Sequence, residues 1–322
     1  MKDVFIATSM SLSLRQELII NTDFDHFRFF SLEEAIKDNE LASKCEVLWV
    51  NLFPIVNKDL VTLFPNLKFV ASATTGITHI DSAITKERGI GIISLQGEKE
   101  FLSEITSTPE FSWGLMLSVW RKINLAAQNY LYEVSIRERY SSMQLKGLTL
   151  GLIGYGRIAK YLAKYGEAFG MNVIYFDPYL EMVDSNHNHR SCSSLDEVLI
   201  SSDVVIICAS VLERDQGNYP LINSLNISRL KKNSIIVNVS RGVLVDEVCL
   251  ASALRSGNLF GVGVDVLTRE DQVSPVKIKS PLELARDEGY NVVITPHIGG
   301  MCDDALLKCT IKIASKIRSQ LN

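Results

Sequence analysis

Residues suited to binding a phosphate are concentrated in one glycine-rich turn near the middle of the chain. The turn runs from Gly154 to Ala159, directly after a short apolar run over 149–153, and a helical pattern follows it. A second apolar run then ends at Asp177. Strand, glycine turn, helix, strand and acid, in that order, bind dinucleotides, because the helix N-terminus offers N–H groups to the pyrophosphate. The segment therefore predicts a dinucleotide site.

Each small residue of this turn has an expected role. Gly154 permits the tight bend, Gly156 lets the backbone approach the pyrophosphate, and Ala159 allows the helix to pack closely on the strand. Asp177 stands where a carboxylate accepts hydrogen bonds from the adenosine ribose hydroxyls. A 2′-phosphate at that point would meet a like charge, so we expect NAD rather than NADP.

Ionisable side chains follow three later apolar runs. The first run is followed by Arg241, the second by Asp265 and Glu270, and the third by His297. Open α/β sheets bind ligands at the carboxyl ends of their strands, so we expect these four groups at one sheet edge, beside the nicotinamide end of the cofactor. A cofactor site alone does not define a reaction, and these groups supply the chemistry that would.

Two α/β sheets are predicted to position these residues. Apolar runs of strand length from residue 149 onward cover 149–153, 172–176, 204–208, 235–239, 261–264 and 292–295. Six strands are what a doubly wound dinucleotide domain needs. The first 105 residues also alternate strand-like and helix-like segments, which predicts a second parallel sheet. Its expected strands are 4–7, 46–50, 69–73 and 91–94, with helices around 32–43, 57–64 and 80–88.

A long helix is expected to join the two regions, with Thr108 as its cap and Pro109 in its first turn. Large apolar residues, Trp113 and Trp120 among them, lie outside the face assigned to the core. A helix that is apolar on more than one side needs a second surface to cover it. A last helix over roughly 303–319 is expected to pack back on the first domain, which leaves no room for a C-terminal regulatory domain.

Composition places further limits on function. The 322 residues are 47% hydrophobic and 22% charged, and the net charge is −4 without a long basic run, so nucleic acid is not an expected partner. The first apolar run is too short for a signal peptide, and none is long enough to span a bilayer. The six cysteines show no paired spacing. We expect a cytoplasmic protein with reduced thiols and no metal site.

Together these motifs resemble the D-isomer-specific 2-hydroxyacid dehydrogenase family over nearly the whole chain. The resemblance rests on the glycine turn with Asp177-Pro178, the Arg241-Gly242 segment with 245–247, the Asp265-to-Glu270 spacing, and the segments 74–81, 108–110 and 296–300. It implies an α/β protein with two Rossmann-like or flavodoxin-like, doubly wound parallel-sheet domains. Residues 1–105 and 298–322 would form the substrate domain, and residues 106–297 the inserted NAD domain.

The resemblance also implies a reaction, the NAD(H)-dependent interconversion of a 2-oxo acid and a D-2-hydroxy acid. His297 would be the general acid/base, Glu270 its orienting partner, and Arg241 the clamp on the substrate carboxylate. The backbone N–H groups of Thr75 and Gly76 would hold the other carboxylate oxygen. Asp265 would hydrogen-bond the nicotinamide carboxamide. The remaining cofactor contacts implied are those of Arg157, Ile158, Ser210 and Thr108. The resemblance further implies a homodimer through the NAD domains, in which the second copy covers the long helix.

Plainer interpretations exist for several of these residues. Each member of the catalytic set has a structural alternative. Arg241 could form a surface ion pair with Asp246 or Glu247. Glu270 could be a solvated charge, and His297 a structural histidine. His79 is favoured as a packed or capping residue over a second base. The segment 187–189 is favoured as a solvated loop over a metal site, because no cysteine or carboxylate supports it at the right spacing.

Departures from the family pattern bear on the substrate. Asp271 replaces the usual proline after Glu270, and the proline usual after the strand at 204–208 is missing. Asn51-Leu52 stand about where phosphoglycerate-type members carry an arginine, which argues against a phosphorylated substrate. The alternative function is an NAD(H)-sensing, corepressor-like binding protein on the same fold. A formate-dehydrogenase-like activity is disfavoured, since that group does not use a glutamate partner for its histidine.

Overall fold

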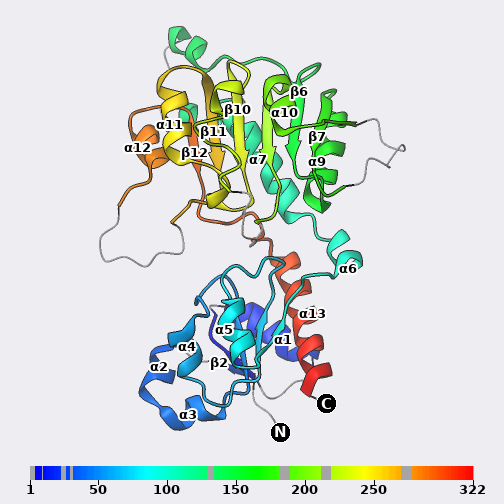
Figure 1. Cartoon of the computed structure of the whole chain (residues 1–322), viewed down its shortest axis with the longest axis vertical. Coiled ribbons are helices and arrows are strands. Elements are labelled where there is room, and N and C mark those ends of the chain that lie inside the picture. Colours follow the sequence, from blue (N-terminus) through cyan, green and yellow to red (C-terminus); the bar gives the residue numbers. More distant parts are fainter. Residues whose placement is uncertain are drawn as a thin grey trace. The chain divides into compact units, whose positions relative to one another are not determined.

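The chain folds into two compact units in the computed structural model (Figure 1). One, the discontinuous unit, comprises Met1–Ile105 and Met301–Asn322; the other, the continuous unit, is Thr106–Gly300. The second junction had been expected at 297/298. The structure describes residues 4–8, 10–22, 27–29, 32–128, 134–180, 189–211, 219–269 and 278–321.

A parallel sheet forms the centre of the continuous unit. In the described part of this unit it has seven strands, in the order β12-β11-β10-β9-β6-β7-β8. They are β6 (Thr149–Ile153), β7 (Asn172–Phe176), β8 (Arg190–Ser191), β9 (Val204–Ile207), β10 (Ser234–Asn238), β11 (Leu259–Val264) and β12 (Val292–Ile294). The winding direction reverses between β6 and β9, so the predicted doubly wound fold is confirmed. The edge strand β8 was missed because two residues are too few to show an apolar run.

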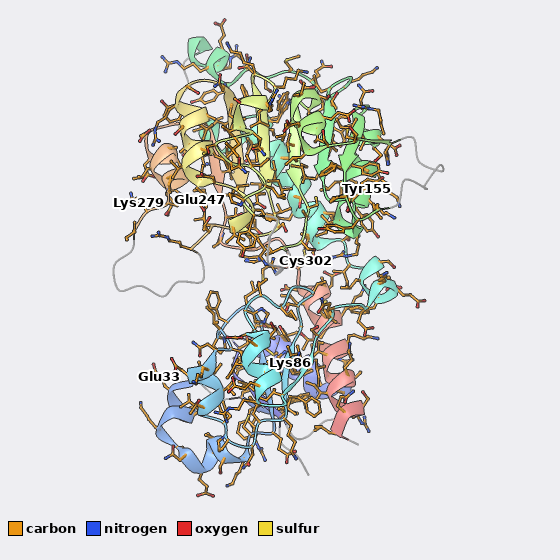
Figure 2. The ribbon with its side chains drawn as sticks, in the orientation of Figure 1. Glu33, Lys86, Tyr155, Glu247, Lys279 and Cys302 are labelled. Carbon is orange, nitrogen blue, oxygen red and sulfur yellow. The ribbon has the colours of Figure 1, made fainter. Side chains whose placement is uncertain are left out.

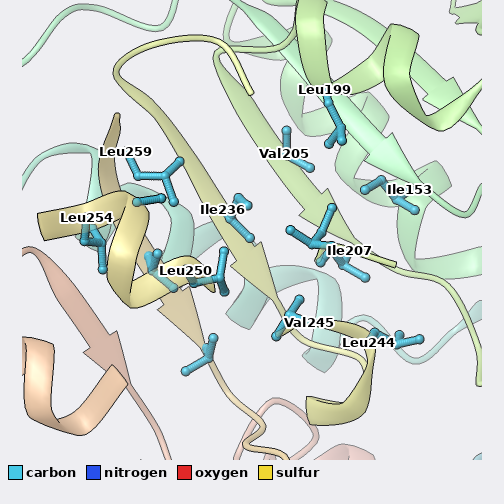
Figure 3. Packing of buried hydrophobic residues seen from close by; sticks show 14 of the residues in the cluster. Ile153, Leu199, Val205, Ile207, Ile236, Leu244, Val245, Leu250, Leu254 and Leu259 are labelled. Carbon is cyan, nitrogen blue, oxygen red and sulfur yellow. The ribbon is translucent and has the colours of Figure 1, made fainter. Parts of the chain in front are cut away.

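Helices cover both faces of this sheet. On one face lie α7 (Ser107–Trp120) and α9 (Arg157–Ala168); on the other lie α10 (Leu195–Ser201), α11 (Glu247–Arg255) and α12 (Pro281–Asp287). Alternate strand residues supply the two cores, so Val205 and Ile207 pack with α10 and α11 (Figure 3), whereas Val204 and Ile206 pack with α7 and α9. Strands buried on both faces explain why these segments are continuous apolar runs. Shorter segments are α8 (Ile123–Gln128), η1 (Val134–Tyr140), η2 (Ile227–Arg229) and η3 (Gly242–Leu244).

Helix α7 corrects two predictions. Its N-cap is Thr106, and Thr108 lies in the first turn, where its carbonyl accepts the Ser112 hydroxyl at 2.6 Å. The second copy expected to cover Trp113 and Trp120 is not needed, because these side chains are only 8% and 4% exposed within the single chain.

The chain's own later segments provide the cover for these two indoles. Trp113 makes edge contacts with Tyr165 and Phe169, and Trp120 donates its indole N–H to the Met143 carbonyl at 2.8 Å. The covering residues lie far along the chain, so the apolar pattern of one helix could not reveal them.

The discontinuous unit holds a parallel sheet of five strands among the described residues, in the order β2-β1-β3-β4-β5. They are β1 (Val4–Ile6), β2 (Phe27–Phe29), β3 (Val47–Val50), β4 (Phe69–Ser72) and β5 (Gly91–Ile93). This is the flavodoxin-like order, as predicted. Its helices are α1 (Leu12–Thr22), α2 (Leu32–Lys37), α3 (Asn39–Lys44), α4 (Lys58–Thr62), α5 (Ser82–Glu87), α6 (Lys99–Ser103) and α13 (Asp303–Leu321).

Three local features of this unit differ from the sequence pattern. Strand β2 was missed because its three residues are too few to show an apolar run. Helix α1 was missed because its apolar residues do not follow one face: Leu18 is buried, whereas Leu12 and Ile20 are exposed. The single helix expected over 32–43 is split at Asp38, whose extended backbone and side chain cap α3. The C-terminal helix is confirmed, and its buried face packs on α1, β4 and β5. No helix within the described ranges is both long and apolar enough to cross a membrane.

Candidate active site

The glycine turn lies where β6 ends and α9 begins. Gly154 has φ +83°, a conformation that favours glycine, and a Cβ there would lie 2.8 Å from the Ala209 backbone. Gly156 is the N-cap of α9 and caps it without a side-chain hydrogen bond. A Cβ on Gly156 would meet no atom within 4 Å. The turn therefore has open space beside an α-helix N-terminus, and Arg157 and Ile158 are the first residues of that helix.

Helix α9 packs very closely on the sheet behind this turn. Ala159 is fully buried, as its small side chain predicted. Gly166 allows an equally close approach, since a Cβ there would lie 2.9 Å from the Leu150 side chain. The role of Gly166 was missed, although its place on the buried face of α9 was a usable signal.

Asp177 follows β7 and holds the glycine turn directly. One carboxylate oxygen accepts the Tyr155 N–H at 2.8 Å, and the other accepts the Tyr179 N–H at 3.0 Å. The side chain is only partly buried. An acid expected to serve the ribose thus also orders the backbone expected to serve the pyrophosphate.

The segment after β9 forms the next part of this sheet edge. Ser210 is exposed there, and the Ser240 hydroxyl donates to the Ala209 carbonyl. Burial raises the pKa of the Cys208 thiol to about 12. A protonated thiol is a poor nucleophile, so Cys208 is a packing residue at neutral pH.

Arg241 stands in a bend just past β10 that Asn238 shapes. The buried Asn238 amide donates to the Arg241 carbonyl at 2.9 Å, and its oxygen accepts the Ser240 N–H at 3.1 Å. The Arg241 guanidinium is half-buried and donates to the Ser240 carbonyl at 2.7 Å. Asn238 was not singled out from the sequence, because a buried asparagine at a strand end resembles any polar loop residue.

Asp246 and Glu247, which follow Arg241 in the sequence, each accept backbone hydrogen bonds. Asp246 caps α11 by accepting the N–H groups of Val248 and Cys249. Glu247, labelled in Figure 2, is 8% exposed and accepts the Thr268 N–H at 2.7 Å.

Gly242 brings the segment after β10 against the segment after β11. A Cβ on Gly242 would lie 2.1 Å from the Leu267 backbone, so only glycine fits there. The Arg241 bend is thus built directly against the segment that follows β11. Glu270 and Asp271, further along that segment, lie outside the described residues.

His297 follows β12 and is held by Asp265, which follows the neighbouring strand β11. The His297 backbone has φ +54°, and its N–H donates to the Asp265 carbonyl at 2.8 Å. The Asp265 carboxylate is 2% exposed. It accepts the Thr295 hydroxyl at 2.6 Å, the Ile298 N–H at 2.9 Å and the Gly299 N–H at 2.8 Å. Asp265 therefore fixes the backbone on both sides of His297.

The start of α7 completes this end of the site. A Cβ on Gly299 would lie 2.9 Å from an Asp265 carboxylate oxygen, 3.4 Å from the Phe111 ring and 3.7 Å from the Thr108 side chain. The structure thus brings Thr108, Asp265 and the His297 segment together, although they come from three distant parts of the chain.

In the discontinuous unit, Thr75 and Gly76 lie in the bend after β4. The Thr74 hydroxyl donates to the Gly76 carbonyl at 2.8 Å and lies 2.8 Å from the Ser72 hydroxyl. His79 is 4% exposed and hydrogen-bonds Ser72 through Nε2 at 3.1 Å. His79 is a packed residue that supports the bend, as the favoured interpretation held.

Known proteins identify this combination of a dinucleotide turn and two doubly wound sheets. The family model of the D-isomer specific 2-hydroxyacid dehydrogenase NAD binding domain matches residues 113–299, and that of the catalytic domain matches residues 7–149. The chain belongs to this family. It is therefore an NAD-dependent oxidoreductase that interconverts 2-oxo acids and 2-hydroxy acids.

Individual relatives cover almost the whole chain. A hydroxypyruvate reductase of Thermotoga maritima is 31% identical over 291 residues, 89% of this chain and 90% of that protein. A putative 2-hydroxyacid dehydrogenase of Haemophilus influenzae is 27% identical over 302 residues, 92% and 89% of the two chains. The structure of D-lactate dehydrogenase from Aquifex aeolicus with NAD and lactic acid superimposes with a TM-score of 0.82. It covers 98% of this chain and 95% of that one at 23% identity, so it supports the fold.

Proposed function

We propose that Arg241, Glu270 and His297 carry the interconversion of a 2-oxo acid and a D-2-hydroxy acid in this protein. The observation that supports this most is the place of Arg241, Asp265 and His297. They follow the carboxyl ends of β10, β11 and β12, which are adjacent in one parallel sheet. Ligands of doubly wound sheets bind at that edge.

The residues of the glycine turn fit NAD. Gly156 leaves room for the pyrophosphate, and the first turn of α9, with Arg157 and Ile158, would hold it. Asp177 would accept the ribose hydroxyls, with Ser210 on the same edge. Bound NAD(H) supplies or accepts the hydride.

Thr108 and Asp265 would hold the nicotinamide end of the cofactor. They lie together against Gly299, beside His297. This arrangement supports a nicotinamide site next to the proposed acid/base.

Proton transfer and substrate binding would fall to side chains of this chain. His297 would hold a proton at its imidazole and give it to the ketone oxygen, with Glu270 orienting the ring. Arg241 would bind the substrate carboxylate through its planar fork, and the N–H groups of Thr75 and Gly76 would bind the other oxygen. A fixed backbone around His297 is what a general acid requires, because misplacement of the proton slows the transfer.

The substrate we propose is a small 2-oxo acid without a phosphate. Asn51 is neutral, and its side-chain oxygen accepts the Ala73 N–H at 3.3 Å, tying the end of β3 to that of β4. A neutral side chain used in this way gives a phosphate no counter-charge at that position.

A panel of phosphorylated and unphosphorylated 2-oxo acids tests the activity, with NADH oxidation as the measurement. We expect turnover with an unphosphorylated acid. NADH binding without turnover of any acid would instead indicate an NAD(H)-sensing protein, and preference for a phosphorylated acid would overturn the substrate class.

We also propose a cytoplasmic homodimer that binds no nucleic acid. With Trp113 and Trp120 covered, the dimer rests on other exposed apolar side chains near the end of α7, Ile123 at 53% and Met143 at 65% exposure. The net charge of −4 disfavours nucleic acid. Light scattering at micromolar concentration tests the assembly, and a monomer mass would refute it.

A further inference from the structure

A histidine outside the proposed catalytic set is buried beside the cofactor turn. The segment 187–189 was expected to be a solvated loop; His187 and Asn188 lie outside the described residues. For His189 that expectation is wrong, because its side chain is only 7% exposed. It immediately precedes β8, the edge strand that pairs with β7.

Three segments meet at the His189 ring. Its Nδ1 is hydrogen-bonded to the Tyr155 hydroxyl, and its Nε2 lies 2.9 Å from a carboxylate oxygen of Glu167 in α9. The imidazole and the Glu167 carboxylate lie within ion-pair distance, and a negative charge beside Nε2 favours a proton on that nitrogen. In the neutral ring, Nδ1 is then the acceptor for the Tyr155 hydroxyl. The charge of Glu167 therefore favours the tautomer in which Nδ1 accepts the Tyr155 hydroxyl.

Tyr155 transmits this arrangement to the glycine turn. It stands between Gly154 and Gly156, is 3% exposed, and lies on the β7 side of the sheet (Figure 2). Its ring stacks on Tyr175 with centroids 3.7 Å apart and 15° between planes. Its backbone N–H donates to Asp177. The same residue is thus anchored at its hydroxyl by His189 and orients Asp177 with its backbone.

We propose that Tyr155, His189 and Glu167 are positioning residues for the adenosine half of NAD. The flanking glycines have no side chains with which to hold the turn, so the Tyr155 side chain does so. Fixing Tyr155 fixes both the turn and the direction of the Asp177 carboxylate, and with it the preference for NAD over NADP. This inference rests on the proposed cofactor site at Gly156 and Asp177.

The Tyr155→Phe variant tests the proposal most directly, because it keeps the stacked ring and removes only the hydroxyl. Loss of one hydrogen bond corresponds to about a three- to tenfold change in an equilibrium constant. We expect the Kd for NADH, from fluorescence titration, to rise by that factor, and the NADH-to-NADPH preference in KM to narrow. The kcat at saturating NADH and the KM for the 2-oxo acid should stay unchanged. Tyr161→Phe, in the α9 helix that follows the turn, is the matched control and should leave all four values unchanged.

Two histidine variants divide the network. His189→Asn places an amide where Nδ1 lies and should retain most of the NADH affinity, whereas His189→Gln reaches toward Glu167 and should behave like Tyr155→Phe. Equal affinities for the wild type and both His189 variants would overturn the proposal, as would a Tyr155→Phe variant that binds NADH normally. If Tyr155→Phe fails to fold, the His189 pair decides.

The outcome for the wild type separates this proposal from the one it rests on. A wild-type protein that does not bind NADH would refute the cofactor site itself. A wild type that binds NADH, with variants that lose kcat in proportion to affinity, would show general damage and would refute a positioning role.

Discussion

The glycine turn after β6 and the His297 segment after β12 lie at the same carboxyl edge of one sheet, yet they are held in different ways. The turn is ordered by neighbours in one β-α-β unit, as when Asp177 accepts the Tyr155 N–H. The His297 edge is ordered by distant segments, with Asp265, Gly299 and the start of α7 packed together. A motif held by neighbouring residues can be predicted from the sequence. Where distant segments hold a motif, the sequence shows its reactive residues but not the residues that position them.

The largest effect is expected at the histidine itself. His297→Ala should lower kcat by about two to four orders of magnitude, the range for loss of a general acid. The Kd for NADH should hardly change, because the turn proposed to bind its phosphates is ordered independently. Steady-state kinetics with the best 2-oxo acid measure this, and near-normal kcat would remove His297 from the mechanism.

Asp265→Asn tests whether the distant support matters as much as the reactive group. Asparagine replaces one acceptor oxygen with a donor that faces the Ile298 or Gly299 N–H, so the backbone around His297 must shift. A displacement near 1 Å costs on the order of 100-fold in rate.

We expect this loss in kcat, with Thr295→Val, which removes a single hydroxyl donor, affecting it far less. If the Asp265→Asn variant lost mainly NADH affinity, the carboxamide contact implied by the family would be its main role.

Arg241→Lys should reduce the efficiency on 2-oxo acids by about 10- to 100-fold, since lysine keeps the charge but loses one charge-assisted hydrogen bond. Both KM and kcat for the acid should suffer, while NADH binding stays normal. Wild-type efficiency in this variant would exclude the carboxylate clamp.

Two variants of the glycine turn separate its effect on stability from its effect on NADH binding. Gly154→Ala should destabilise the fold by about 1–3 kcal/mol through strain at positive φ and contact with Ala209. Gly156→Ala should leave thermal unfolding unchanged, because its methyl meets no atom within 4 Å, yet weaken NADH binding on the order of tenfold. Equal effects of the two variants on stability would contradict the distinction.

The smallest effect is expected for cofactor choice. Asp177→Ala should narrow the preference for NADH over NADPH by about three- to tenfold, the value of roughly one ordinary hydrogen bond. The ratio of kcat/KM for the two cofactors measures this. A wild type that used both cofactors equally would show that Asp177 does not discriminate.

The sequence alone determined the parts of this protein that depend on neighbouring residues. Continuous apolar runs predicted the parallel strands, because strands buried on both faces need apolar residues throughout. The glycine turn and Asp177 were legible because turn, helix and acid belong to one unit. The resemblance to the family rested on several such motifs that occur in the family's order along the chain.

Tertiary structure decided what depends on distant contacts. It gave Trp113 and Trp120 their cover, Thr268 its acceptor in Glu247, and His189 its place between Tyr155 and Glu167. No local pattern records such pairings, because a side chain's burial and partners are set by whichever segment folds against it.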